Sequence, residues 1–505
     1  MNPKRLTFLV ALVSCATACT VGPNFTPPPA PDESVYSQSL PPSGGPTGVI
    51  YGADMADDWY TLFHSNALNT LVHQALANNP DLSAARHGLV AAQYELKAVS
   101  GAALPQIDGS GKVERAHANG SFLYGPVNQL DVTAYQFSAG PSLAYNLDLF
   151  GGVRRSIEAQ RAQTAGVREQ VLDTYVTLVD QVVITAFDYA ASCAQIEVTR
   201  SLVKELRDQF DLTSKLEQAG KTTRSDTLEA QSQLEVTAAT LPALEQQRDT
   251  YRNALAQLTA SNPDDFRMPD LSLRDFDLPD DVPVSLPSAL VRHRPDILAA
   301  EDQLHQSSAS IGVAEAARFP SITLSAQYAQ QTSFVNEFLT RPGGIWSLGA
   351  DLAAPIYHGG TLAAREKEAR EQYLQAQDTY RKTVVGAFVE VANALQSLGH
   401  DRDGYLAHTR ALDAARANSD LSEAQYRAGR YTELQVLTAQ QQFQQAALSQ
   451  VQSDAQRFTD IASLFRALGG GWWNAQADPA ALPVAAAQPT PAAPEAAAPH
   501  QGELR

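Results

Sequence analysis

Cysteine is scarce in this 505-residue sequence, which contains only Cys15, Cys19 and Cys193. Two of the three fall within the first 19 residues, so Cys193 has no disulfide partner in the rest of the chain. A disulfide-stapled fold is therefore excluded, and no Cys/His cluster has the spacing of a zinc site. We expect neither a metal nor a cofactor, and we interpret Cys193 as a small packing residue.

Catalytic signatures are also missing. The sequence has no G-x-S-x-G, no H-E-x-x-H and no phosphate-binding loop. The triplet His358-Gly359-Gly360 suggests an oxyanion loop, but the matching triplet earlier in the chain is Phe150-Gly151-Gly152, so the histidine is not part of a repeated pattern. We therefore predict that the protein is not an enzyme.

Positive charge is in deficit, with 37 Lys and Arg against 55 Asp and Glu and a net charge of −18. A nucleic-acid-binding protein needs a basic face, so this class is excluded. An acidic chain is often simply soluble. The sharper interpretation is that acidic side chains line a water-filled conduit.

The N-terminus has an apolar run that is too short to span a bilayer. Lys4 and Arg5 precede the run Leu6 to Val13, which fits the h-region of a signal peptide better than a membrane anchor. We assign residues 1–18 to a signal peptide. Residues 19–58 follow as a tether, rich in Pro, Gly and Ser up to residue 50.

Small residues at Ala16-Thr17-Ala18 come directly before Cys19, an arrangement that resembles a bacterial lipoprotein cleavage site. Leucine is commoner than alanine at the position of Ala16. The alternative is ordinary signal cleavage beside a spare cysteine. The resemblance implies that Cys19 carries lipid, palmitate included. Thr20 follows Cys19, where aspartate often marks inner-membrane retention, and this favours the outer membrane.

Proline is absent from Val153 to Ala219, and apolar or small residues recur there in steps of three and four. A helix of this length extends on the order of 100 Å, far beyond the roughly 11–12 residues of an average helix. Leu362 to Ala428 forms a second run of nearly the same length. A globular domain cannot enclose either rod.

Each rod is followed by a shorter helical run, Thr222 to Ala260 and Tyr431 to Leu468, after a glycine-containing tip at Gly220 or Gly429. The tips predict two antiparallel hairpins, and anchors repeated in the same order indicate an internal duplication. We place repeat 1 at residues 59–261, a proline-rich linker at 262–292 and repeat 2 at 293–473. Residues 474–505 form an Ala/Pro-rich tail that we expect to be disordered.

Inside each repeat the hydrophobic period changes from helical to alternating. Four strands are predicted near 105–116, 133–147, 320–330 and 345–356, and each is long enough for the roughly 9–11 residues of a membrane-crossing strand. A soluble sheet with one wet face is the alternative, but the rods and the export signal favour the membrane. Four strands cannot close a barrel, and lipid does not tolerate open edges, so the chain must oligomerise.

Five segments carry a resemblance that covers roughly residues 19 to 473: Cys19-Thr20-Val21-Gly22-Pro23-Asn24-Phe25, Asn79-Pro80-Asp81-Leu82, Asp148-Leu149-Phe150-Gly151, Tyr426-Arg427-Ala428-Gly429 and Ala467-Leu468-Gly469-Gly470-Gly471-Trp472. Together they resemble the TolC-like outer-membrane efflux channels, specifically their lipoprotein branch.

The resemblance implies an α+β membrane protein with an internally duplicated chain. Three protomers build a twelve-stranded transmembrane β-barrel, continued by a long periplasmic α-helical barrel, and residues 262–292 form part of an equatorial collar. The implied function is the passive exit duct of a tripartite pump for drugs or other small toxic molecules, joined to a periplasmic adaptor and an inner-membrane transporter. The alternative is a structural or secretion-associated envelope lipoprotein whose helices bundle without a lumen.

The resemblance also implies a periplasmic gate near the hairpin tips. In the family, an acid after the first tip bonds a tyrosine before the second, and the matching residues are Asp226 and Tyr426. A second contact, between a hydroxyl and an arginine, maps to Ser225 and Tyr431, where tyrosine replaces the arginine. The alternative role for Asp226 is to cap or charge the start of its helix.

The lipoprotein branch narrows its aperture with a leucine ring and an aspartate ring, which map to Leu434 and Thr438. The leucine is kept, but Thr438 has no charge. The sequence leaves open whether Glu433 or Glu229 supplies the acidic ring instead.

Overall fold

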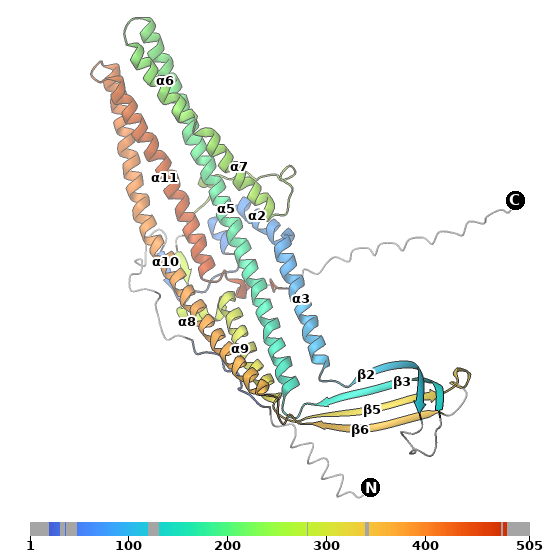
Figure 1. The fold of residues 1–505 in the computed structure, drawn as a ribbon. Helices are drawn as coiled ribbons and strands as arrows, with labels where there is room; N and C mark the ends of the chain where they lie inside the picture. Colours follow the sequence, from blue (N-terminus) through green and yellow to red (C-terminus); the bar gives the residue numbers. More distant parts are fainter. Residues whose placement is uncertain are drawn as a thin grey trace, which may run out of the picture.

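The computed structural model describes residues 20–30, 36, 48–119, 131–279, 281–338, 343–475 and 478–481. Its described part is elongated, with two helical hairpins that end in tips at one end and a four-stranded sheet that projects from the other (Figure 1). Cys19 and residues 482–505 lie outside the described part.

Two helices of 67 residues each form the length of the molecule: α5 (Gly152–Gln218) and α10 (Thr361–Arg427). Both begin after a glycine in the left-handed region, Gly151 at φ 82° and Gly360 at φ 84°, a conformation that glycine adopts without strain. The predicted rods are confirmed to within one residue at each end.

Each long helix turns back into a shorter partner. Helix α10 pairs with one unbroken helix, α11 (Glu433–Ala467), whereas α5 pairs with two, α6 (Arg224–Ala238) and α7 (Leu241–Leu258). The sequence pattern predicted one helical run from 222 to 260. The break falls next to Pro242, because proline lacks the N–H that would continue the helix and fits only in a first turn.

The remaining helices brace the middle of the molecule: α2 (Asn66–Asn78), α3 (Pro80–Gly101), α8 (Pro287–His293) and α9 (Pro295–Ala316). Helices α2, α3, α7 and α9 all pack against α5. The core there is aromatic, with Phe63, Phe187 and Phe458 in mutual ring contact. An 18-residue stretch of α5 is apolar enough to cross a membrane, but 61% of it is buried inside the protein, as in a core helix.

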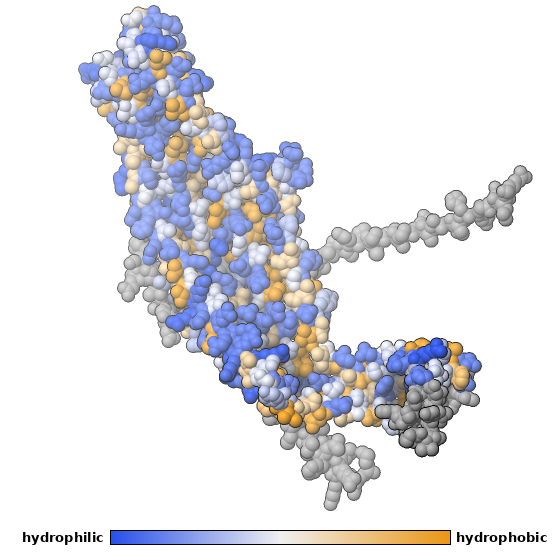
Figure 2. All heavy atoms as spheres, in the orientation of Figure 1, coloured by the Kyte–Doolittle hydropathy of each residue, from blue (hydrophilic) through white to orange (hydrophobic). Residues whose placement is uncertain are grey.

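The sheet has the order β2-β3-β5-β6, with every neighbouring pair antiparallel. Its strands are β2 (Gln106–Asn119), β3 (Asp131–Leu147), β5 (Ser321–Thr332) and β6 (Gly344–Ala353), which confirms the four predicted strands. Large apolar side chains on both outer strands face outward, including Ile107 and Val113 of β2 and Trp346 and Leu348 of β6. Figure 2 shows apolar residues among polar ones along this sheet.

The N-terminal tether is more ordered than its Pro-, Gly- and Ser-rich composition predicted. Strand β1 (Gly48–Tyr51), inside the predicted tether, pairs in parallel with β4 (Asp281–Val284) of the predicted linker. Residues 20–25 also lie against the protein, where Val21 N–H donates to the Phe150 carbonyl (3.1 Å). The guanidinium of buried Arg155 holds the carbonyls of Val21 and Gly22.

The disordered tail was predicted to begin too early, at residue 474. Asn474 Nδ2 donates to the Met55 carbonyl (2.7 Å), and Arg86 Nε donates to the Pro479 carbonyl (3.0 Å). Ala480 is buried against the central core. Alanine and proline can fill a gap between larger side chains without forming a core of their own, so composition alone misplaced this boundary.

Candidate functional site at the hairpin tips

The two hairpin tips lie side by side at the end of the molecule far from the sheet (Figure 1). Gly220 and Gly429 take φ values of 70° and 72° and allow the chain to reverse within a few residues. Thr223 and Thr432 then cap α6 and α11, each in a reciprocal capping box. Hydrogen bonds within the first turn therefore define both helix starts, and the candidate gating residues lie in or next to these turns.

Asp226 belongs to the capping box of α6. Its Oδ2 accepts hydrogen bonds from Thr222 Oγ1 (2.6 Å), Thr223 N–H (2.9 Å) and Thr223 Oγ1 (2.8 Å). The bond from the Thr222 hydroxyl, followed by those from Thr223, lowers the pKa of Asp226. The hydrogen bonds of Asp226 thus stay within its own turn, which is the helix-capping role.

Tyr426 lies in the last turn of α10, half-buried, close to two carboxylates. Burial raises the pKa of Tyr426, and the charges of Glu433 and Asp226 raise it further. Tyr426 is thus within electrostatic reach of Asp226. No hydrogen bond joins their side chains among the described residues.

Glu433 is the best-enclosed acid at the tips. It lies in the first turn of α11 with only 5% of its surface exposed, and its Oε1 accepts from Thr213 Oγ1 (2.5 Å) and Gln209 Nε2 (3.5 Å) of α5. Its Oε2 is buried without a hydrogen-bond donor among the described residues. Burial raises the pKa of Glu433, and nearby Asp226 and Glu229 raise it further.

Glu433 and Glu229 were the two candidates for an acidic aperture ring. In the protomer the Glu433 side chain is buried between α11 and α5, whereas Glu229 is exposed on α6. Which of the two supplies the ring stays a prediction. Thr213 and Gln209 were missed, although the signal was present: they continue, at helical spacing, the apolar face Leu202, Val203 and Leu206 of α5.

The remaining candidates are exposed in the protomer. Leu434 has 57% of its surface exposed, and Thr438, one turn later on the same face of α11, is exposed as well. The Thr438 hydroxyl donates to the Leu434 carbonyl (2.8 Å) within its own helix. Ser225 and Tyr431, the second predicted pair, are also exposed.

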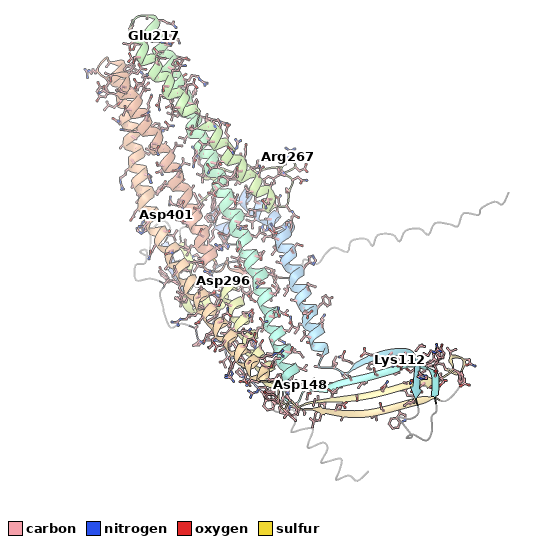
Figure 3. The ribbon with its side chains drawn as sticks, in the orientation of Figure 1. Lys112, Asp148, Glu217, Arg267, Asp296 and Asp401 are labelled. Carbon is pink, nitrogen blue, oxygen red and sulfur yellow. The ribbon has the colours of Figure 1, made fainter. Side chains whose placement is uncertain are left out.

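A small apolar cluster below the tips joins the two repeats. Leu202, Val203 and Leu206 of α5, Leu234 of α6 and Leu437 of α11 are buried together. Gln441 of α11 donates to Gln233 of α6 (2.5 Å) beside it. This cluster fixes the rotation of α11, and that rotation points Glu433 inward and Leu434 outward. Figure 3 marks the tip region by Glu217, in the last turn of α5.

A duplicated chain with two long helical hairpins and a shared four-stranded sheet defines a class of envelope channel components. The sequence pattern described as outer membrane efflux protein matches residues 71–261 and 286–470, so the chain belongs to that family. It is an outer-membrane component of an efflux system that extends into the periplasm. Members of the family are channel proteins rather than enzymes.

Named relatives agree over nearly the whole chain. The toluene efflux pump outer membrane protein TtgC of Pseudomonas putida is 30% identical over 93% of this chain and 96% of its own. The cation efflux system protein CusC of Escherichia coli is 27% identical over 94% of this chain and 100% of its own. The solved outer-membrane channel OprN is 26% identical and superposes with a TM-score of 0.81, over 90% of this chain and all of its own.

Proposed function

We propose that three copies of this chain form the passive exit duct of a tripartite efflux pump. The observation that supports this most directly is the four-stranded sheet, whose outer strands β2 and β6 pair on one side only and carry exposed apolar side chains. Such edges are not stable in lipid, and three sheets of four strands give a closed twelve-stranded barrel. The hairpins then line a tube that continues into the periplasm.

The proposed partners are a periplasmic adaptor and an inner-membrane transporter, and the duct itself needs no nucleotide. Support comes from the relatives, whose names describe components of a toluene pump and of a cation efflux system. Because those cargoes differ in chemistry, we assign the broader class of drugs and other small toxic molecules to this chain. The acidic composition fits a wet conduit.

Lipid at Cys19 is part of the proposal. The next residues, Thr20 and Val21, lie at the junction between the sheet and α5, where Thr20 packs against Gly151 and Val21 bonds Phe150. In the proposed orientation this junction is the periplasmic surface of the membrane. An acyl chain on the neighbouring residue therefore reaches the bilayer without stretching the chain.

The proposed resting gate is the pair of tips. Asp226 and Tyr426 form the latch, with Ser225 and Tyr431 beside it, and Leu434 narrows the aperture. Glu433 adds a contact that holds the second hairpin to the first through Thr213.

The decisive experiment combines native mass spectrometry in detergent with planar-bilayer recording. We expect a trimer that passes ions. A stable monomer with an intact sheet signal, a dimer or a tetramer contradicts the strand count. A trimer that never conducts favours the alternative, a helical bundle without a lumen.

A further inference from the structure

Helix α10 is less covered within the protomer than α5, because it packs mainly against α11 and α9, whereas α5 packs against α2, α3, α9 and α11 as well as its hairpin partners α6 and α7. Helix α5 has buried residues along most of its length, as far as Thr213 near the tip. In α10 the buried residues run from Ala369 to Leu398, and after that only Ser422 is buried. The central core therefore ends at Leu398 on α10. Over the next 23 residues this helix has no buried anchor within the protomer.

Two glycines lie at the start of this less buried stretch, at Gly399 and Gly404; beyond them α10 contacts α11 through polar and aromatic side chains such as Thr409 with Gln450 and Arg416 with Phe443. A Cβ added to either glycine would meet no atom within 4 Å, so close packing does not require glycine at these positions. Glycine in a helix interior weakens the helix. The alignment that pairs Gly429 with Gly220 pairs these positions with Ala190 and Gln195 of α5. The helix-weakening glycines at 399 and 404 therefore occur in α10 and have no counterpart at the matching positions of α5.

Two carboxyl groups, those of Asp401 on α10 and Asp460 on α11, lie beside the two glycines. Asp401, between the two glycines, faces Asp460 of α11, and its Oδ2 is buried without a hydrogen-bond donor among the described residues. Asp460 accepts from Gln456 Nε2 (2.8 Å). The matching residues of the first repeat, Ser192 and Tyr251, carry no carboxyl group. Figure 3 shows Asp401 partway along α10, between the tip and the sheet end.

The charged groups around Asp401 come mainly from α11. Arg457 is the nearby cation, but it lies over the Tyr405 ring at 4.2 Å and 3.6 Å from Asp454 Oδ1. On α10 itself, Arg402 pairs with Asp403 (3.6 Å).

Helix α9 packs against a different part of α10, nearer to the sheet. Glu315 of α9 pairs there with Arg370, and Arg294, at the start of α9, pairs with Glu390. Among the described residues, no Lys or Arg therefore forms an ion pair with Asp401 or Asp460.

We propose that Gly399 to Gly404 is a hinge in α10, and that protonation of the Asp401–Asp460 pair sets how firmly it is held. With one proton shared, one carboxyl group donates to the other and ties α10 to α11. With both groups ionised, they repel and the hinge is released. The inference rests on the proposed function, because the hinge would move one tip of the gate.

The direction of the pH dependence follows from the burial of the pair. Burial, reinforced by Asp460, raises the pKa of Asp401 to about 7. The hydrogen bond between the two carboxyl groups is therefore fully formed at acidic pH and is lost as the pH rises through this value. Efflux through a gate with this hinge would respond to the acidity of the periplasm.

Hydrogen exchange on the full-length trimer in detergent tests the hinge, at about pH 6 and about pH 8 and corrected for intrinsic rates. Amides of 399–405 should exchange at least about tenfold faster at the higher pH. The corresponding segment of α5, residues 190–196, should not change and serves as the internal control. Asp460→Asn should abolish the difference, because its amide donates to Asp401 at either pH. Asp403→Asn, an exposed control, should preserve it.

A second pair of variants separates the hinge from the proton switch. Gly399→Ala and Gly404→Ala should each slow exchange by about fivefold by strengthening the helix. If Asp460→Asn does not form a trimer, Asp401→Asn replaces it with the same expectation.

Exchange that is independent of pH, or a pH difference that persists in Asp460→Asn, overturns the proton switch. Exchange that Gly399→Ala and Gly404→Ala leave unchanged overturns the hinge. Bilayer recordings on the same preparations keep the two proposals apart. A conducting trimer with an unresponsive 399–405 segment refutes the hinge alone, whereas a non-conducting trimer counts against the duct.

Discussion

At the hairpin tips one buried carboxylate joins helices from the two repeats. Glu433 of α11 accepts from Thr213 and Gln209 of α5, and both donors are themselves buried. A buried carboxylate with one unsatisfied oxygen is costly when charged. The contact is therefore strongest when Glu433 is protonated, and this makes its stability depend on pH.

Glu433→Gln tests this dependence. Because the pKa of Glu433 is raised in the folded protein, its contribution is present at low pH and is lost as the pH rises through the folded pKa. Glutamine keeps an oxygen for Thr213 and has no charge. We expect amide protection of residues 433–437 in the parent to fall from acidic to neutral pH, and the variant to stay protected. Glu235→Gln, on an exposed face of α6, is the matched control, because Glu235 is not among the charges that shift the pKa of Glu433. A parent segment without pH dependence would refute the assignment.

The latch is tested by the double variant Asp226→Ala, Tyr426→Phe. We expect higher single-channel conductance and entry of large antibiotics without loss of the trimer, because the substitutions remove both members of the proposed latch, which lie within electrostatic reach of each other, and the trimer has three copies of it. Tyr426→Phe alone leaves the α6 capping box intact, so it separates the latch from loss of the cap, which costs about 1 kcal/mol. If the double variant conducts like the parent while Leu434→Ala opens the pore, the apolar ring is the gate.

The resemblance named Asp226 and Tyr426 as a latch, and in the structure they lie within electrostatic reach of each other. The latch itself stays a prediction, and the orientation of Glu433 could not be read from the sequence. The direction in which Glu433 points depends on how α11 is rotated against α5. Leu437 and Leu234 fix that rotation from different repeats, and no local pattern contains this information.

At the scale of elements, α5 and α10 were predictable because local signals agree. Both lack proline and have glycines at both ends, of which Gly151 and Gly360 take positive φ, and α5 has a helical hydrophobic period in addition. The β1–β4 pair was not predictable. It joins residues more than 200 positions apart in parallel, and four residues are too few to show a period. Long-range pairings of this kind depend on the packing of the whole chain.

A substitution at Gly471 tests how closely the segment after α11 packs against the N-terminal segment around Ala56. It takes φ 72°, and an added Cβ would lie 2.1 Å from the Ala56 carbonyl oxygen. Gly471→Ala should therefore lower the thermal midpoint much more than Gly52→Ala, whose φ is 79° with no atom within 4 Å of an added Cβ. The control isolates the strain of a left-handed alanine, about 1 kcal/mol. Equal shifts in differential scanning calorimetry would mean that the Ala56 segment moves aside freely.

For the molecule as a whole, the attachment of the N-terminus to the membrane is the most direct prediction. Intact mass of the protein extracted from membranes should show a mature chain that begins at Cys19 and carries acyl groups. Cys19→Ser should remove the added mass while leaving the docked segment 20–25 in place, because that segment is held by Arg155. A mature start elsewhere, or an unmodified Cys19, would refute lipidation.

Residues 399–421 of α10, which are not fully buried in the protomer, predict a pattern in mutational data. Between Leu398 and Ser422 no residue of this helix is fully buried in the protomer, so most substitutions there leave the folding of a single chain largely intact. In a variant library scored both for protein abundance and for resistance to toxic compounds, most of these positions should keep abundance. Positions that nevertheless lose resistance would mark where one subunit touches another, or where the pump's other parts take hold.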